Sequence, residues 1–303
     1  MSLSVKEILN IGQRRLQDAG VSDAALDSKL LYCFMTGITT GRLFIMYQNI
    51  LQDGQCDEYF RLIDERASGK PLQYITGTQE FMGLEFDVNE SVLIPRQDTE
   101  TMVEDVISVI KDGALRGESL EGTGRREWDI LDLCAGSGAI GVSLAKLLDG
   151  VKVNVTCSDV SKAALEVARK NAEKLGVSKS VKFAEGDMFA PFDGRFKKKK
   201  FDLIVSNPPY IESGVIPTLQ TEVKDHEPMS ALDGGEDGLD FYRIIAREAG
   251  EFMKKRGILF LEIGCDQGSA VRELLTEAGG YSDIRCLKDL AGRDRIIYAV
   301  KAE

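Results

Sequence analysis

The feature that most constrains the fold is an alternation of strand-like and helix-like segments from about residue 98 to residue 303. Short apolar runs, such as residues 201–209, are separated by amphipathic runs of ten or more residues, such as 162–176. Strands spaced in this way pair in parallel through right-handed crossovers, and helices then cover both faces of the sheet. The pattern therefore predicts a doubly wound α/β domain over residues 98–303.

Seven strands are expected in this domain. A helix at 239–256 should lead into a strand at 257–264, and the last two strands, at 282–287 and 295–300, are close enough in sequence to pair as a hairpin. The remaining strands are expected at residues 128–134, 151–159, 180–187 and 201–209, and the remaining helices at residues 98–111, 139–148, 162–176 and 268–280. The polar, glycine-rich stretch 112–127 is expected to be an exposed loop.

Residues 1–78 have a different pattern, in which apolar residues recur at helical spacing. Ser4 is a candidate N-cap for a helix over 5–20, and a second helix is expected over 23–37. The residues expected to face inward in the second helix are Leu26, Leu30, Leu31 and Phe34. We predict a small bundle of four or five helices that acts as a substrate-recognition domain. Strand-forming residues around Gly83 predict a β-hairpin linker over 79–97.

The charge and the cysteine pattern argue against several functional classes. A net charge of −11 disfavours a broad grip on nucleic acid, which needs many Lys and Arg side chains against phosphates. The six cysteines form no C-x-x-C pair and His226 is the only histidine, so no metal site is expected. The lysine run 197–200 suggests either a phosphate-binding patch or a solvated loop, and we favour the loop.

Localisation follows from the same composition. The chain shows neither an uninterrupted apolar run of about 18 residues nor a targeting sequence, and scattered cysteines suit a reducing compartment. We therefore expect a cytoplasmic protein without membrane contact, and a monomer.

A glycine loop follows the predicted strand 128–134. Gly136, Gly138 and Gly141 satisfy the G-x-G-x-x-G pattern of dinucleotide-binding proteins, in which a helix N-terminus faces the ligand. However, Asp132 ends the strand just before the loop, and its carboxylate would repel a pyrophosphate. The same carboxylate suits a ligand that carries an ammonium and a sulfonium, which favours S-adenosylmethionine over NAD.

Two further acidic residues follow the next two strands. Asp159 stands where a carboxylate accepts hydrogen bonds from both ribose hydroxyls of a bound cofactor. The alternative role, as N-cap of the following helix, suits Ser161 better. Asp187 follows Gly186 at the end of the third strand and would face the adenine amino group.

The sequence Asn207-Pro208-Pro209-Tyr210 ends the predicted strand at 201–209. Ligands of open α/β sheets bind outside the carboxyl ends of the strands, so Asn207 should face the cofactor. The Asn207 side-chain oxygen and the Pro208 carbonyl could accept both N–H bonds of a planar NH2 group, and Tyr210 could pack against its face. These features predict methyl transfer to an amide or to an adenine. The alternative is that the prolines only form a rigid exit from the strand.

The chain resembles the HemK/PrmC family of release factor glutamine methyltransferases in several further segments. They are LQYITG at 72–77 with EF at 80–81, LIPRQDTE at 93–100, EPMSALDGGEDGLDFYRII at 227–245, LEIGCDQG at 261–268 and GRDRI at 292–296. The resemblance implies a Rossmann-like, seven-stranded methyltransferase domain behind a helical N-terminal domain. It also implies methyl transfer from S-adenosylmethionine, which leaves S-adenosylhomocysteine, to the glutamine of the Gly-Gly-Gln motif in peptide chain release factors.

The resemblance also assigns roles to single residues. Those implied to line the cofactor are Asp132, Cys134, Ala135, Gly136, Ser137, Gly138, Asp159, Asp187, Met188 and Asn207. Those implied to hold the glutamine or to shape the substrate side are Asn207, Pro208, Pro209, Tyr210, Phe81, Arg96 and Glu100. Cys134, Gln97 and Met188 depart from the family pattern of glycine, proline and tryptophan, which leaves the adenine contacts of Met188 open. A ribosomal-protein glutamine methyltransferase, a DNA or RNA amino methyltransferase and a non-enzymatic cofactor-binding module rank below this reading.

Overall fold

The computed structural model describes residues 3–51, 53–115, 118–119, 127–193 and 199–303. These residues form two compact units, one of residues 1–78 with 219–226 and one of residues 79–218 with 227–303. Sequence reasoning had assigned 219–226 to the methyltransferase domain. The expectations for 112–127 and for the lysine run 197–200 lie partly outside the described residues. The described part of the first of these contains two short paired strands, β3 (Ala114–Leu115) and β4 (Glu118–Ser119).

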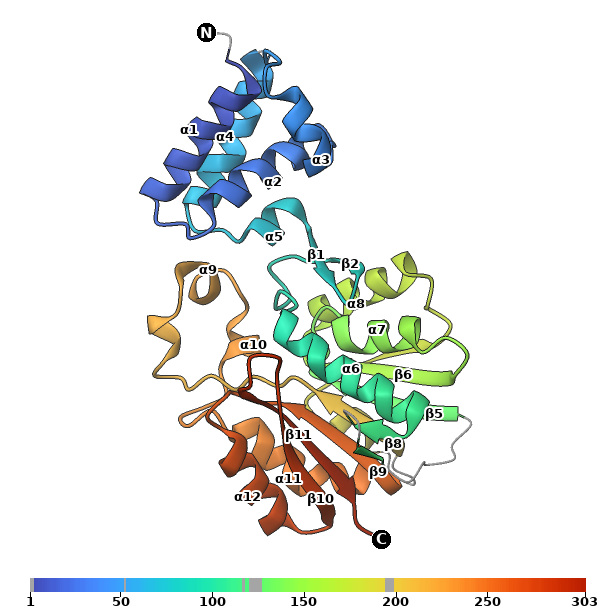
Figure 1. Ribbon diagram of the computed structural model, residues 1–303. Coiled ribbons are helices and arrows are strands. Elements are labelled where there is room, and N and C mark those ends of the chain that lie inside the picture. Colours follow the sequence, from blue (N-terminus) through green and yellow to red (C-terminus); the bar gives the residue numbers. More distant parts are fainter. Residues whose placement is uncertain (1–2, 52, 116–117, 120–126, 194–198) are drawn as a thin grey trace. The chain divides into compact units, whose positions relative to one another are not determined.

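The first unit is the predicted helical bundle. Its elements are α1 (Val5–Asp18), α2 (Ala24–Thr36), α3 (Thr40–Leu43), η1 (Phe44–Met46), α4 (Asp53–Ala67), α5 (Leu72–Thr76) and α9 (Thr221–Lys224) (Figure 1). Ser4 caps α1 as expected, because its hydroxyl accepts from the Glu7 N–H at 3.3 Å while the Glu7 carboxylate accepts from the Ser4 N–H at 2.8 Å. Ile8, Leu16 and Leu31 are fully buried between these helices.

The predicted inner face of α2 was wrong at two positions. Leu26 and Phe34 are 54% and 48% exposed, whereas the polar residues Asp27 and Ser28 are buried. The Ser28 hydroxyl lies 2.8 Å from the Tyr59 hydroxyl, and Asp27 accepts a hydrogen bond from Arg66 at 2.7 Å. Asp27 and Ser28 therefore face the interior of the bundle, where each has a hydrogen-bonding partner. The spacing of apolar residues alone does not predict this.

The predicted hairpin lies at the beginning of the second unit. Strands β1 (Thr78–Phe81) and β2 (Leu84–Asp87) pair with each other, and the turn residues Met82 and Gly83 have φ values of 55° and 70°. Two such residues in succession are typical of a type I′ hairpin turn.

The sheet of the second unit contains the seven predicted strands in the order β10-β11-β9-β8-β5-β6-β7. In chain order they are β5 (Glu127–Leu133), β6 (Lys152–Asp159), β7 (Val181–Glu185), β8 (Phe201–Ser206), β9 (Met253–Glu262), β10 (Tyr281–Lys288) and β11 (Asp294–Lys301). Strand β11 is antiparallel to both of its neighbours, whereas β7, β6, β5, β8 and β9 are mutually parallel. The expected hairpin of the last two strands is thus confirmed.

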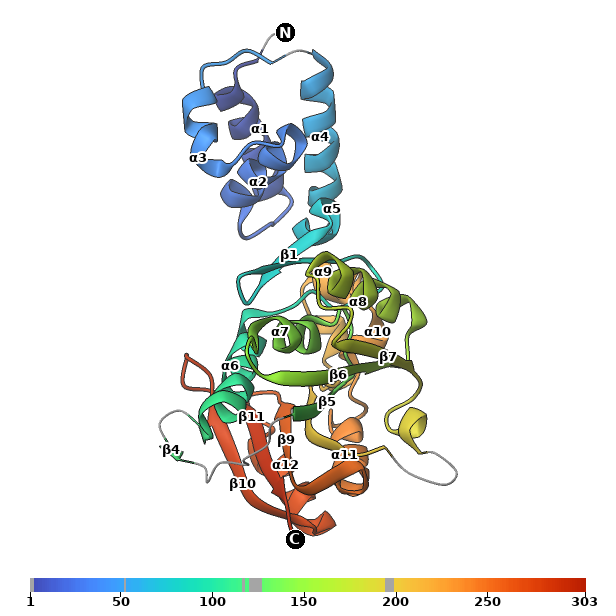
Figure 2. The same ribbon diagram turned by 90° about the vertical axis from the view of Figure 1, so that its right-hand side faces the viewer.

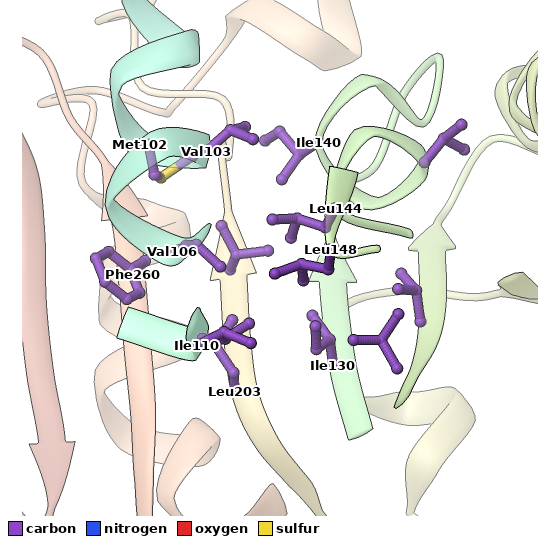
Figure 3. Close-up of a cluster of buried hydrophobic side chains, with 14 of the residues drawn as sticks. Met102, Val103, Val106, Ile110, Ile130, Ile140, Leu144, Leu148, Leu203 and Phe260 are labelled. Carbon is purple, nitrogen blue, oxygen red and sulfur yellow. The ribbon is translucent and has the colours of Figure 1, made fainter. Parts of the chain in front are cut away.

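Helices cover both faces of this sheet (Figure 2). One face carries α6 (Gln97–Asp112), α7 (Ala139–Leu147) and α8 (Lys162–Lys174), and the other carries α11 (Asp240–Phe252) and α12 (Gly268–Ala278). On the first face, Val106 of α6 and Leu144 of α7 point toward each other above Ile130 and Leu203 of the sheet (Figure 3). All four are completely buried, so this layer anchors the helices whose N-termini lie near the strand ends.

The shorter elements of the unit are η2 (Ala190–Phe192), η3 (Ile216–Thr218) and α10 (Met229–Leu232). The predicted helix at 239–256 was too long, because α11 ends at Phe252 and β9 begins at Met253. Met253 is completely buried and pairs with Phe201 of β8, so tertiary pairing overrides the helical pattern of its neighbours. Across the described ranges, no helix is both long and apolar enough to cross a membrane.

Candidate active site

The site lies where the strand order of the sheet changes direction. Strand β5 has β6 on one side and β8 on the other, and Leu133 pairs with Ser206 at the carboxyl ends of β5 and β8. The Ser206 hydroxyl donates to the Leu133 carbonyl at 2.7 Å. The glycine loop after β5 and the Asn-Pro-Pro-Tyr turn after β8 therefore begin side by side, as the topology of such sheets requires.

The glycine loop turns the chain from β5 into helix α7. Cys134, Gly136 and Gly138 have φ values of 62°, 55° and 77°, and Gly138 is the N-cap of α7. A Cβ added at Gly136 would meet no protein atom within 4 Å, so this glycine serves the turn and leaves the space above the loop open. Ala139 and Ile140 of the first turn of α7 line that space.

Asp132 does not reach this space, although sequence reasoning placed it at the cofactor. It is completely buried, and its Oδ2 accepts from the Gly141 N–H at 2.8 Å. Burial raises the pKa of this carboxyl to about 7. A Cβ on Gly141 would lie 2.8 Å from the same oxygen and 2.7 Å from the Cys157 Sγ. Asp132 thus secures the first turn of α7 from below, and Gly141 allows the helix to approach the sheet.

Asp159 at the end of β6 faces the loop and lines the pocket. Its Oδ2 accepts from the Gly136 N–H and its Oδ1 accepts from the Ser161 N–H, both at 2.8 Å. Burial raises the pKa of Asp159, while these backbone hydrogen bonds act in the opposite direction. Ser161 is the N-cap of α8, since its hydroxyl accepts from the Ala164 N–H at 3.2 Å. Asp159 is therefore left to brace the loop and to offer its remaining lone pairs to a ligand.

The Gly186-Asp187-Met188 turn after β7 forms the next wall. Asp187 is exposed, whereas Met188 is buried and has a φ of 45°. A Cβ at Gly186 would lie 2.5 Å from the Pro191 ring, so the turn is tightly packed from behind.

The Asn-Pro-Pro-Tyr turn follows β8 and is held at both ends. The Asn207 Nδ2 lies 3.4 Å from the Thr99 Oγ1 near the start of α6. At the other end, Gln267 donates through its Nε2 to the Tyr210 carbonyl at 2.9 Å. Pro208 and Pro209 are buried between these anchors. The two anchors and the fixed φ of proline leave the turn little freedom.

The segment before α6 closes another side. Phe81 is 1% exposed and packs edge-on against Phe86. Arg96 pairs with the buried carboxylate of Glu227 at 2.6 Å, and the Glu100 carboxylate accepts from the backbone N–H of Met82 in the hairpin turn. Glu100 thus holds the hairpin against α6.

These elements enclose a pocket of about 400 Å³. The predicted site residues that line it are Phe81, Arg96, Cys134, Ala135, Gly136, Ser137, Asp159, Asp187, Met188, Asn207 and Pro209. Those predicted for the site that do not line it are Glu100, Asp132, Gly138, Pro208 and Tyr210. Among the described residues, no group of three or more His, Cys, Asp or Glu is placed to hold a metal ion.

Sequence reasoning missed several residues of the site. Thr99 and Phe241 line the pocket, as do residues 228–231. Gln267 and Glu262 do not line it but contact the Asn-Pro-Pro-Tyr turn or its neighbours. The signal was available, because each of these residues lies in or beside a segment through which the chain resembles the HemK/PrmC family.

Comparison with known proteins covers both units. Residues 7–77 match the PrmC N-terminal domain, and residues 125–275 match a methyltransferase domain. A release factor glutamine methyltransferase of Moorella thermoacetica is 41% identical over 301 residues, which are 99% of this chain and 100% of that protein. The chain belongs to the release factor glutamine methyltransferase family.

A second member of the family, from Bacillus subtilis, is 37% identical and covers 98% of each chain. Among solved structures, the hMettl16 catalytic domain in complex with MAT2A 3′UTR hairpin 6 aligns with a TM-score of 0.51 at 15% identity, over 84% of each chain. At that identity the likeness concerns the fold alone. The family and the fold together confirm the seven-stranded methyltransferase domain behind a helical N-terminal domain that the sequence predicted.

Proposed function

We propose that this protein transfers a methyl group from S-adenosylmethionine to the side-chain amide nitrogen of the glutamine in the Gly-Gly-Gln motif of peptide chain release factors. The observation that carries the proposal is the position of Asn207. It lines the pocket beside the glycine loop, at the switch in strand order, and it begins a turn held at both ends. Full-length similarity to release factor glutamine methyltransferases supports the substrate.

The pocket suits S-adenosylmethionine in its charge and in its backbone. The N-terminus of α7 and the open space above Gly136 let the ligand approach the loop closely. Asp159 and Asp187 supply negative charge to a ligand that carries an ammonium and a sulfonium. We assign Asp159 to the ribose hydroxyls, Asp187 and Met188 to the adenine, and residues 134–138 to the rest of the cofactor.

The cofactor supplies an electrophilic methyl group bound to a positively charged sulfur. An amide nitrogen is a poor nucleophile because its lone pair is delocalised, so the protein must hold it in line with that methyl group. The Asn207 side-chain oxygen and the Pro208 carbonyl accept hydrogen bonds from the two N–H groups of the substrate amide. Tyr210 supports the turn that carries these two acceptors. As the nitrogen would gain the methyl group, the bond between that methyl and the sulfur would break and leave S-adenosylhomocysteine, and the methylated nitrogen would then release one proton to solvent. Orientation of this kind is worth up to about 7–11 kcal/mol in favourable systems.

The deciding experiment measures methyl transfer from labelled S-adenosylmethionine to a release factor and to the same factor with its Gly-Gly-Gln glutamine changed to alanine. Only the first should be labelled, and equal labelling of both would reject the glutamine as the acceptor. Asn207→Ala should abolish transfer while cofactor affinity stays within a few-fold. Asn154→Ala is the matched control, because the Asn154 side chain donates to the exposed Glu127 and to Asp129, near the amino ends of β5 and β6 and away from the pocket. Release factors act in translation, so we place the reaction in the cytoplasm, with the enzyme acting as a monomer.

A further inference from the structure

A buried carboxyl group lies directly behind Asn207. Ser206 of β8 pairs with Leu261 of β9, so the next residues along the two parallel strands, Asn207 and Glu262, lie at the same edge of the sheet. Glu262 is 1% exposed, and its Oε2 has no hydrogen-bond partner within the described part of the chain. A buried carboxyl with an unsatisfied oxygen is costly, so its presence calls for a reason.

Glu262 and Asn207 share a neighbour, Thr99. The Thr99 hydroxyl lies 3.4 Å from the Asn207 Nδ2. The Thr99 and Asn207 side chains both lower the pKa of the Glu262 carboxyl, which is the effect of groups that donate to it. A hydroxyl has one hydrogen to donate, whereas an ionised carboxylate can only accept. If Glu262 is ionised, Thr99 must donate to it, and the Thr99 oxygen can then only accept from Asn207.

This order sets which way the amide of Asn207 faces. Its NH2 group must lie toward Thr99 and Glu262, and its oxygen is left for the pocket. We propose that Glu262, acting directly and through Thr99, is a positioning residue that fixes the Asn207 amide so that its oxygen accepts from the substrate amide. With a neutral acid in this place, the carboxyl and Thr99 could donate toward Asn207, and the amide could turn its NH2 group to the pocket. Such an amide cannot accept a hydrogen bond from the N–H of a glutamine.

The charged groups around Glu262 decide when this orientation holds. Burial raises the pKa of Glu262 to about 7, and the hydrogen bonds with Thr99 and Asn207 and the charge of Arg295 oppose that rise. Arg295 on β11 is itself held by Asp98 at 3.1 Å and by Asp289 at 3.4 Å. The other titratable groups that face Glu262 are Tyr210 and Tyr242, both neutral because burial raises the pKa of each phenol.

The sign of the pH dependence follows. The pKa of Glu262 is raised above its ordinary value of 4.5, so the carboxyl is ionised above about pH 7 and becomes protonated as the pH falls through that value. The orientation of Asn207, and with it kcat, should therefore be lost on the acid side of pH 7. A group that only supported packing would not produce this loss of kcat on the acid side of the pH profile.

The test uses the full chain with a release factor and labelled S-adenosylmethionine, and it rests on the proposed function. Glu262→Gln should lower kcat at pH 8 by about tenfold or more, as expected for an interaction needed in the transition state, while KM and cofactor affinity stay within about twofold. It should also remove the acid limb near pH 7. Wild-type kcat in this variant, or a lower kcat with the limb retained, overturns the proposal.

Threonine variants keep the proposal testable if Glu262→Gln does not fold. Thr99→Val should lower kcat in the same way, and Thr99→Ser should restore it because it keeps the hydroxyl. Thr101→Val is the control, since Thr101 is also buried on α6 and is 7% exposed. Equal kcat in Thr99→Val and Thr101→Val refutes the role of Thr99. If the wild type does not label the release factor at all, the proposed function fails instead.

Discussion

Replacing Gly141 with alanine sets two physical effects against each other. Gly141 lies inside helix α7, where alanine is favoured over glycine by up to about 1 kcal/mol. The added Cβ, however, would lie 2.7 Å from the Cys157 Sγ, 2.8 Å from the Asp132 Oδ2 and 3.0 Å from the Val155 Cγ1. All three residues belong to strands of the sheet and are completely buried, so their side chains have no free space into which they could move.

The close contacts should win. Overpacking of a tight core costs about 1–3 kcal/mol, and three contacts of 3.0 Å or less place Gly141→Ala in the upper part of that range. After the gain in helix propensity, the free energy of unfolding should fall by about 1–2 kcal/mol. For a unit of this size that corresponds to a fall in Tm of roughly 2–8 °C. Since α7 must also move outward, cofactor affinity should fall.

The assay is urea unfolding followed by the fluorescence of Trp128, the single tryptophan of the chain, which is buried in β5 of the same unit. Gly250→Ala is the matched control, because Gly250 is also helical, belongs to the same unit as Trp128, and an added Cβ there comes no closer than 3.7 Å to another atom. It should leave stability unchanged or slightly raised. In a Cys157→Ala background the cost of Gly141→Ala should shrink, because the closest contact is gone. A Gly141→Ala protein as stable as the wild type would refute the packing argument.

Three further outcomes follow from single contacts. Asp27→Ala should lower the free energy of unfolding by about 3 kcal/mol, because it breaks a buried ion pair with Arg66. Asp64→Ala, at the exposed ion pair with Arg15, should lower it by less than about 1 kcal/mol. Urea unfolding followed by far-UV circular dichroism measures both, and equal losses would contradict the difference in burial. Asp159→Ala should weaken S-adenosylmethionine binding by about tenfold or more in a calorimetric titration, and an unchanged Kd would exclude the ribose role. Gln267→Leu should lower kcat with little change in cofactor affinity, because it removes the hydrogen bond to the Tyr210 carbonyl; a wild-type kcat would show that this anchor is dispensable.

The arrangement of the sheet could be predicted because it depends on patterns that extend over many residues. Strands separated by long amphipathic helices cross over in the right-handed sense and pair in parallel, so the carboxyl ends of β5 and β8 lie at the same edge of the sheet. Most of the predicted strands lie within one to three residues of those found. The end of α11 could not be predicted, because Met253 leaves the helical pattern only to pair with Phe201, which is 52 residues earlier in the chain (253 − 201).

Side-chain direction within the site was less accessible to sequence reasoning. Asp132 stands at a strand end next to the glycine loop, and that position is compatible with a ligand contact. Along a strand, successive side chains point to opposite faces of the sheet. Whether Asp132 contacts a ligand or a helix therefore depends on which of these two lies on its face, and the strand sequence alone does not tell this. Helix α7 covers it, and the carboxylate binds the Gly141 N–H and not the pocket.

The same limit applies to the most informative motif of the chain. Asn-Pro-Pro-Tyr identifies an amide at the end of β8, but an amide presents either an acceptor or a donor, and the motif does not say which. The direction depends on residues from elsewhere in the sequence: Thr99 from α6, and Glu262 from the end of β9. A carboxylate that can only accept gives this chain of hydrogen bonds a direction, and a hydroxyl extends it by one step. The buried acid beside Asn207 thus turns a residue of ambiguous chemistry into an acceptor, which is the role that methylation of an NH2 group requires.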